Sequence, residues 1–435
     1  MNSVQENSVL GKANTLNDMN TNQSFSTAID WGRWVFIAVM VVFLIGLGYR
    51  TIYSVAWNDI ERTDYTVYRA AGQAVIDHAN IYEAHNIRGW LYVYPPPFAI
   101  LMIPFAKLSL VWGSGLWYLL SIFCLAQATV MSVRLANDAL PVGSKSIDQW
   151  TLYEVPLLLA SPWLVSGLMR CQASGYMVWL MIASIYFYCR GRPVLGGMGL
   201  AAAALIKAFP IAMLAYFIWQ RQWRFVGACF VFLVLGGLLL PSLVYGWHQT
   251  LDYWNQWLHI VAGPALSSND SRESNLLYAQ LLDSQKPRNQ SLEALLLSLN
   301  IPSQQTKPIL AFMAVGMFSV MAWLATRANA KTHILILSAF VMWNLLIPPI
   351  SETHYFGLML LPLAVLTATW LAGTDSFSRR MSAGVLILCF IFTLWVNIDK
   401  PMELYRLLCW ASLGIWFCLL LLAHRQTLAE SRHTQ

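Results

Sequence analysis

Long apolar runs recur along almost the whole chain, and no other feature of the sequence constrains the fold as strongly. A helix needs about 20 apolar residues to cross the hydrocarbon core of a bilayer. Only 11% of the 435 residues are charged, whereas soluble domains carry about 25%. So few charges cannot cover the surface of a water-soluble protein of this size. The sequence therefore predicts an all-α, polytopic membrane protein and excludes an ordinary soluble enzyme.

Twelve segments are apolar enough to be candidate transmembrane helices: 32–54, 110–134, 150–169, 174–190, 194–207, 208–219, 225–245, 308–326, 334–349, 356–373, 381–397 and 403–423. The short pair 194–207 and 208–219 is flanked by basic residues on both sides: Arg190, Arg192, Arg221 and Arg224. Because short cytoplasmic loops collect Lys and Arg, both ends of this pair belong in the cytoplasm. The pair then crosses twice, and Pro210 breaks the helix between the two crossings.

The same charge rule places the basic short loops and both chain termini in the cytoplasm. Residues 1–30 are polar and predict a disordered cytoplasmic tail, and 426–435 form a second cytoplasmic tail. Between them, 31–425 are predicted to form a single transmembrane domain of the plasma (inner) membrane. Two long segments, 55–109 and 246–307, then lie on the external, periplasmic face.

The first external segment contains two predicted interfacial helices. Residues 65–78 carry apolar side chains at near-helical spacing, which indicates a short helix on the membrane surface. Residues 98–108 are mostly apolar but too few to cross the bilayer, so an interfacial or re-entrant helix is expected.

Several classes of site and partner find no support in the sequence. The seven cysteines contain no Cys-x-x-Cys pair, so neither a disulfide framework nor a zinc site is predicted. The net charge of +6 is not gathered in a Lys/Arg cluster, so no nucleic-acid partner is expected. No acidic cluster suits a divalent ion, and we expect neither a metal nor a cofactor.

Two charged residues stand out on the external side. Asp64 comes directly before the predicted helix 65–78, where it is either a helix N-cap or a general base. Asp59 and Glu61 are close alternatives for the base. Lys207 lies in an apolar run, where a cation is costly unless it has a partner or an anion to meet. We interpret Lys207 as an anion-binding residue.

Further polar residues fall on the same side. Arg170 is either a snorkelling residue at a helix end or a second cation for an anion. Gln172 either joins two helices by a hydrogen bond or binds a ligand. Glu352 and His354 share a polar turn between two spans, where the imidazole either caps a helix or holds an anionic group. Asn289 is either ordinary loop polarity or a ligand contact.

Acid, amide and cationic groups from five separated segments are thus predicted on one face of the membrane. This arrangement favours an enzyme. A transporter or flippase for lipid-linked saccharides is the alternative, and it needs polar residues at both depths of the membrane. No internal repeat supports an inverted-repeat transporter. A non-catalytic assembly subunit is a third possibility, for which no single polar substitution would abolish function.

Short motifs follow one another between about residues 60 and 360: Asp64-Tyr-x-x-Tyr-x-Ala, Tyr82, Tyr92-x-Tyr-Pro-Pro, Gln172, Ile206-Lys-x-x-Pro, Asn289-Gln-Ser-Leu and Ser351-x-x-His-Tyr. In this order they resemble glycosyltransferase family 87. These are polytopic enzymes of the GT-C class and include polyprenol-phosphate-mannose-dependent mannosyltransferases. Two residues depart from the family pattern around Gln172, since Cys171 replaces a Gly and Ser174 replaces an Asn.

The resemblance implies a GT-C-like fold and an inverting transfer of a hexose, with mannose as a candidate, from a polyprenyl-phosphate donor. The acceptor is a hydroxyl of a lipid or glycan outside the cytoplasm. For this reaction we assign Asp64 as the catalytic base. The remaining candidates are donor-phosphate contacts (Lys207, His354 and Arg170) and sugar or acceptor contacts (Gln172, Asn289, Glu352, Tyr68 and Tyr94). The two tyrosines are alternatively packing or interfacial aromatics.

Overall fold

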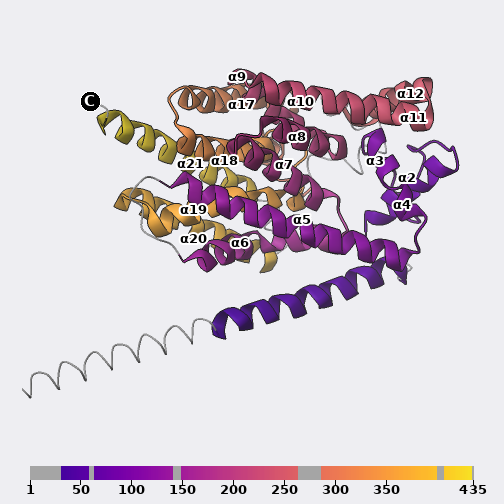
Figure 1. Ribbon diagram of the computed structural model, residues 1–435, viewed down its shortest axis with the longest axis horizontal. Coiled ribbons are helices and arrows are strands. Elements are labelled where there is room, and N and C mark those ends of the chain that lie inside the picture. The colour runs from indigo at the N-terminus through magenta and orange to yellow at the C-terminus, as the bar shows by residue number, and fades with distance from the viewer. Residues whose placement is uncertain (1–30, 58–62, 141–147, 263–285, 399–405, 434–435) are drawn as a thin grey trace, which may run out of the picture. The chain divides into compact units, whose positions relative to one another are not determined.

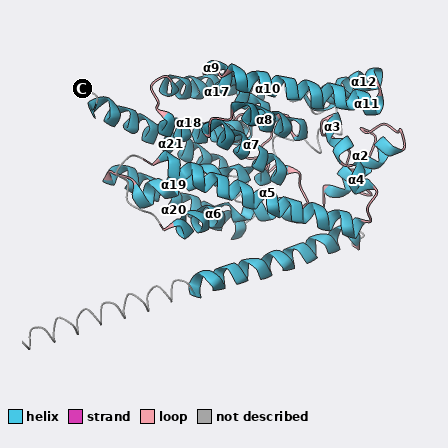
Figure 2. Cartoon of the chain, in the orientation of Figure 1, coloured by secondary structure: helices cyan, strands magenta, loops and turns pink. Residues whose placement is uncertain are grey.

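The computed structural model describes residues 31–57, 63–140, 148–262, 286–398 and 406–433. Regular structure in these residues is helical (Figure 2), apart from two isolated β-bridges, His85–Leu91 and Asn289–Glu352. The predicted all-α class is therefore confirmed. The predicted tail at 1–30 and most of the loop between α12 and α16 lie outside the described residues.

An N-terminal helix, Trp31–Ala56, begins the described chain. The helices that follow are α2 (Tyr65–Ile76), α3 (Pro96–Leu101), α4 (Ile103–Ala106), α5 (Leu110–Ala139), α6 (Gln149–Met169), α7 (Ser174–Cys189), α8 (Pro193–Ile206), η1 (Phe209–Met213), α9 (Leu214–Trp219), α10 (Trp223–Val234), η2 (Leu235–Leu239), α11 (Leu240–Tyr245), α12 (Trp247–Trp257), η3 (Leu258–Ala262), α16 (Leu292–Ser298), α17 (Ser303–Ala325), α18 (Ala330–Leu346), η4 (Thr353–Met359), α19 (Leu360–Ala372), α20 (Ser376–Ile398) and α21 (Leu407–His433).

Each of the twelve predicted spans overlaps a helical segment of the structure. Eight helices in the described residues are long and apolar enough to cross a membrane, and four shorter apolar helical segments accompany them. The chain is thus a multi-pass membrane protein, while the exact number of crossings stays a prediction. At the C-terminus, α21 continues to His433. Most of the segment 426–435, predicted as a tail, is therefore helix.

The chain divides into two compact units at Thr51, inside the N-terminal helix. In the first unit, the side chains of Trp34, Val42 and Ile45 are about two-thirds exposed. A helix with apolar side chains exposed in this way is suited to contact with lipid. The second unit begins at Ile52 and contains all the labelled helices.

The most deeply buried helices of the second unit are α18 and α19. The most apolar stretch of η4 and α19 is 83% buried. Helices α5, α6 and α20 pack on α19, and α21 packs on α18 (Figure 1). The connection from α18 to η4, at residues 347–352, is held within this frame and carries part of the candidate site.

The predicted break near Pro210 is confirmed. Helix α8 ends at Ile206, and Lys207 adopts an extended conformation with φ −141° and ψ 128°. Pro210 lies at the start of η1, where its missing N–H costs no helical hydrogen bond. The chain therefore turns at Lys207 instead of continuing as one long helix.

One end of the second unit gathers α2, α3, α4, α11 and α12 (Figure 1). The carbonyl oxygens of residues 93–96 at this end each accept a hydrogen bond from a side chain. In order, the donors are Trp257 Nε1, Tyr82 Oη, Tyr92 Oη and Tyr245 Oη, at 2.9–3.2 Å. Because prolines at 95–97 have no N–H, this segment cannot pair as a strand. It depends on these aromatic donors, which fix the position of Tyr94.

The other end of α5 carries the residues predicted to face the cytoplasm. Helix α5 has 30 residues and is about 45 Å long. Beyond its last turn, Lys331 Nζ donates to the Leu140 carbonyl at 2.8 Å. Arg190 pairs there with Asp138 at 2.8 Å. These basic residues lie at the end of α5 away from α4, and their cytoplasmic placement stays a prediction.

Candidate active site

The turn between α6 and α7 adopts a conformation that usually requires glycine. The Gln172 N–H donates to the Gly167 carbonyl and the Cys171 N–H to the Leu168 carbonyl, both at 3.0 Å. This pair of bonds is a Schellman motif, which needs a left-handed residue just after the helix. Cys171 takes that position with φ +48°. The family pattern has a glycine at this position, and glycine adopts a positive φ without steric strain. Cys171 forms the same turn although its Cβ makes this conformation less favourable.

The turn directs Gln172 into a group of three hydrogen-bond donors. Its Oε1 lies 3.0 Å from Tyr68 Oη, 3.3 Å from Tyr94 Oη and 3.4 Å from Lys207 Nζ. The two tyrosine oxygens are themselves 2.7 Å apart. Burial keeps the pKa of both tyrosines well above its usual value, so both phenols stay protonated. Each phenol has one hydrogen, and one of the two is used between the tyrosines, so Tyr68 and Tyr94 compete for one lone pair of Gln172 Oε1 while Lys207 donates to the other.

Lys207 is buried among aromatic rings and neutral polar atoms. Its side chain is 7% exposed. Its Nζ lies 4.1 Å from the ring centre of Tyr355 and 5.4 Å from that of Tyr94. Both distances are in the range of cation–π contacts. The two rings form a cage around the ammonium. Phe209 stacks on the nearer ring, Tyr355, with 5.1 Å between the ring centres.

His354 joins Lys207 to an acidic residue. Lys207 Nζ lies 3.5 Å from His354 Nε2, and His354 Nδ1 lies 3.3 Å from Glu352 Oε2. Because an ammonium can only donate, Nε2 must accept, which leaves the ring proton on Nδ1. Nδ1 is close to the carboxylate but makes no hydrogen bond within the described residues. A direct contact of His354 with phosphate stays a prediction.

Asn289 holds the turn that carries Glu352 and His354. Its Oδ1 accepts the Ser351 N–H at 2.9 Å, and its Nδ2 donates to the Pro349 carbonyl at 2.9 Å. Asn289 and Glu352 also form one of the two isolated β-bridges. The side-chain amide is therefore engaged with the backbone on both sides. This geometry favours a supporting role, and the predicted contact of Asn289 with a sugar or acceptor is not tested by it.

Asp64 is not used as a helix cap. It occupies the N-cap position of α2, but its side chain makes no capping hydrogen bond. Its backbone N–H donates to the Arg170 carbonyl at 3.0 Å, which ties the start of α2 to the α6–α7 turn. The capping alternative is therefore not realised. The rival bases Asp59 and Glu61 lie outside the described residues.

The protein raises the pKa of the Asp64 carboxyl to about 7. Desolvation is the largest cause, and the negative charge of Glu352 adds to it. Positive charges oppose the increase, in the order Arg170, Lys207 and Arg288. A carboxyl with a pKa near neutrality is suited to take up a proton at physiological pH.

The structure brings most of the predicted residues together. We call five of them, which share direct contacts, the site cluster: Tyr68, Tyr94, Gln172, Lys207 and His354. Asp64, Arg170 and Glu352 join it through the contacts and charges described above. Asn289 stands behind Glu352 as a support.

The sequence reasoning gave three residues of the site region no role. Tyr355 lies under the Lys207 ammonium, and its place in the Ser351-x-x-His-Tyr motif could have revealed it. Arg288 contributes a positive charge near Asp64 and directly precedes a motif that begins at Asn289. Arg406 contacts the Asn289 carbonyl, but no pattern in the sequence points to it.

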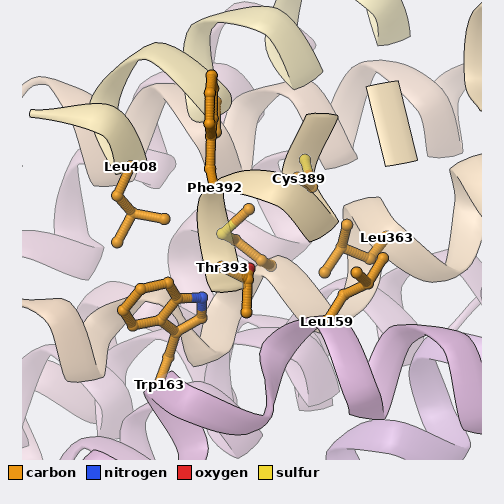
Figure 3. A pocket seen from close by; sticks show the side chains of 9 residues that line it. Leu159, Trp163, Leu363, Cys389, Phe392, Thr393 and Leu408 are labelled. Carbon is orange, nitrogen blue, oxygen red and sulfur yellow. The ribbon is translucent and has the colours of Figure 1, made fainter. Parts of the chain in front are cut away.

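Two cavities lie near each other behind the site cluster. One small cavity is bordered by Gln172, Ser174 and His354, and also by Trp163. Trp163 lines a second, mostly apolar pocket as well, together with side chains of α19, α20 and α21 (Figure 3). No charged side chain lines this second pocket. The first cavity, unlike the second, is bordered by two residues of the site cluster, Gln172 and His354.

Comparison with known proteins identifies a family match. The model of glycosyltransferase family 87 matches residues 92–349, more than half of the chain. The matched part includes Tyr94, Gln172 and Lys207, and it ends before Glu352 and His354.

Two individual proteins are also similar. The polyprenol-phosphate-mannose-dependent alpha-(1-2)-phosphatidylinositol mannoside mannosyltransferase of Mycolicibacterium smegmatis (strain ATCC 700084 / mc(2)155) is 22% identical over 398 residues. That match covers 84% of this chain and 81% of the relative. The crystal structure of ArnT from Cupriavidus metallidurans bound to undecaprenyl phosphate matches 90% of this chain and 77% of its own, at 12% identity and a TM-score of 0.39. A TM-score this low does not by itself establish a shared fold.

The left-handed turn makes a specific prediction about stability. Cys171→Gly removes the steric strain at this position, whereas Cys171→Ala keeps it, so the Gly variant should be more stable by about 1 kcal/mol. Ala173, with φ −69°, is the control, because alanine adopts this conformation without strain. Ala173→Gly should therefore lower the free energy of unfolding by about 0.5–1 kcal/mol. Thermal unfolding in detergent micelles measures both effects. An Ala variant of Cys171 as stable as the Gly variant would contradict the role assigned to the turn.

Proposed function

Because the chain belongs to glycosyltransferase family 87, we propose that it transfers a hexose from a polyprenyl-phosphate donor to an acceptor hydroxyl. Mannose is the first candidate for the sugar, since the similar mycobacterial protein is named as dependent on polyprenol-phosphate-mannose. The acceptor is a lipid or glycan on the external face of the plasma membrane, and both termini are cytoplasmic. Family membership favours transfer over the transporter alternative.

The observation that carries the proposal is the environment of Lys207. Its ammonium is buried against two tyrosine rings, the Gln172 carbonyl oxygen and an imidazole nitrogen. Among the described residues, no carboxylate lies within ion-pair distance of Nζ. A desolvated cation without a counter-ion is costly unless an anion binds to it. The phosphate of a lipid-linked sugar supplies such an anion.

The residues fit the bond changes of an inverting transfer. The acceptor oxygen forms a bond to the anomeric carbon as the bond from that carbon to the phosphate oxygen breaks. The lipid phosphate leaves with the electron pair as an anion, so it needs no general acid. Lys207, with Arg170 nearby, stabilises the negative charge that develops on it. Asp64 takes the proton of the acceptor hydroxyl.

The remaining members of the site cluster are suited to hold the sugar. Lys207 donates to Gln172 and His354 and has a third N–H, so a donor is available when a ligand enters. Sugar hydroxyls both donate and accept, and they match this set of phenol, amide and ammonium groups. Glu352 acts through the pKa of Asp64 and through His354.

Replacing the base should abolish transfer and spare binding. In Asp64→Asn the amide cannot take a proton, so the rate of sugar transfer should fall by about 10²- to 10⁴-fold. Donor binding should persist, because the phosphate contacts remain. The controls Asp59→Asn and Glu61→Gln should retain activity. Full transfer by the Asp64 variant, assayed with a polyprenyl-phosphate sugar, would refute the assignment.

Replacing the buried cation should weaken donor binding. Lys207→Met keeps an unbranched apolar side chain and removes the charge, so we expect affinity for a polyprenyl phosphate to fall by at least about tenfold, which corresponds to about 1.4 kcal/mol. Binding of the uncharged polyprenol should hardly change. Lys331→Met, at the other end of α5, is the matched control. Equal losses for the phosphate and the alcohol would show that Lys207 does not bind phosphate.

The pH dependence of transfer should follow the carboxyl of Asp64. The base must be ionised, so the rate should fall as the pH is lowered through about 7. Glu352→Gln removes a charge that raises this pKa and should move the midpoint to lower pH. Arg170→Gln removes a charge that lowers it and should move the midpoint to higher pH. Arg190→Gln, remote from the site, should leave it in place. Midpoints that move in the same direction would contradict the electrostatic assignment.

A further inference from the structure

A buried arginine far away in the sequence holds the loop that carries Asn289. Arg406 immediately precedes α21 and is 3% exposed. Its Nη1 donates to the carbonyl oxygens of Lys286 at 2.6 Å, Pro287 at 2.9 Å and Asn289 at 2.6 Å. Hydrogen bonds from a charged donor are about twice as strong as neutral ones. One guanidinium nitrogen thus binds three carbonyls of a non-helical loop, and because it has two N–H groups, two of the carbonyls share one of them.

The loop passes this constraint to the turn before η4. Besides the two amide bonds of Asn289, the Ser291 hydroxyl donates to the Pro349 carbonyl at 3.1 Å. The Gln290 N–H donates to the Ser351 carbonyl at 2.8 Å. Glu352 follows directly in the chain. Loop and turn are therefore joined at several consecutive residues, and neither can shift without the other.

Helix packing also connects Arg406 to the turn before η4. Helix α21, which starts after Arg406, packs along α18. Helix α18 in turn leads into the connection at 347–352. The guanidinium is therefore fixed relative to the turn by a rigid helix pair and bonded to it through the loop 286–291.

We propose that Arg406 is a positioning residue for glycosyl transfer, which fixes Glu352 and His354 beside Asp64 and Lys207 by clamping the loop 286–291 onto the turn. This inference rests on the proposed function. It assigns Arg406 no contact with substrate. It affects the transfer reaction only by positioning the Glu352 carboxylate and the His354 imidazole.

The test compares Arg406→Lys and Arg406→Met in the full-length protein. Lys keeps the charge but lacks the planar fork of donors, and Met removes the hydrogen bonds. Small displacements at a reaction centre can cost about 10²-fold in rate, and we expect that loss in the Met variant and a smaller one in the Lys variant. Arg425→Met is the matched control, because this arginine lies on α21, the helix that follows Arg406. It is half-exposed and pairs with Asp375 at 3.4 Å.

The pH profile separates positioning from a general loss of folded protein. The charges that act on Asp64 are those of Glu352, Arg170, Lys207 and Arg288. Releasing the clamp weakens the effects of both Glu352 and Arg288 on Asp64, and Glu352 has the larger effect, so the midpoint should move to lower pH in the Arg406→Lys variant. In a background that carries both Glu352→Gln and Arg288→Gln, the same substitution should leave the midpoint unchanged. A midpoint that never moves, or one that moves equally in both backgrounds, would overturn the inference.

Hydrogen exchange tests the clamp without relying on transfer. In Arg406→Lys, peptides that contain residues 286–291 and 349–352 should exchange faster, whereas those of α5 should not. Unchanged exchange in the loop and turn overturns the role of Arg406 even if the enzyme is active. Faster exchange in a protein that transfers no sugar from a polyprenyl phosphate supports the clamp and rejects the proposed function instead.

Discussion

The buried ammonium of Lys207 is the constraint around which the site is organised. The chain leaves the helical conformation at this residue, and the Lys207 side chain is buried within the protein. Rings of Tyr94 and Tyr355, the Gln172 carbonyl and the His354 imidazole then surround the charge. These partners come from separate segments, and each needs its own support. The α6–α7 turn, the proline segment and the clamped loop each supply one.

The membrane architecture could be predicted from the sequence, because lipid requires long apolar helices and leaves little choice of structure. The twelve apolar segments all became helices, and the break near Pro210 followed from its chemistry. The helix at 65–78 was also predicted, but it is mostly packed against protein: Tyr65, Tyr68 and Ala71 are fully buried. Local spacing identifies an apolar face, yet it does not say whether protein or lipid covers it.

The site was only partly predictable, for a different reason. Asp64, Gln172 and Lys207 were recognisable because polar groups are rare and costly in an apolar chain. Which atoms meet depends on long-range packing, so the competition for Gln172 and the neutral contact of His354 could not be inferred. Arg406 could not be predicted, because its partners are backbone carbonyls. Every residue has a backbone carbonyl, so the amino-acid sequence does not show which ones an arginine binds.

The proline segment at 93–96 has a consequence for control of the site from a distance. Its conformation is set by hydrogen bonds from four aromatic side chains and not by its own backbone pairing; two of these donors, Tyr245 and Trp257, lie on α11 and α12. Movement of α12 would therefore displace Tyr94 and with it one wall of the cage around Lys207. The surroundings of the ammonium are thus coupled to the packing of a helix that contributes no residue to the site cluster.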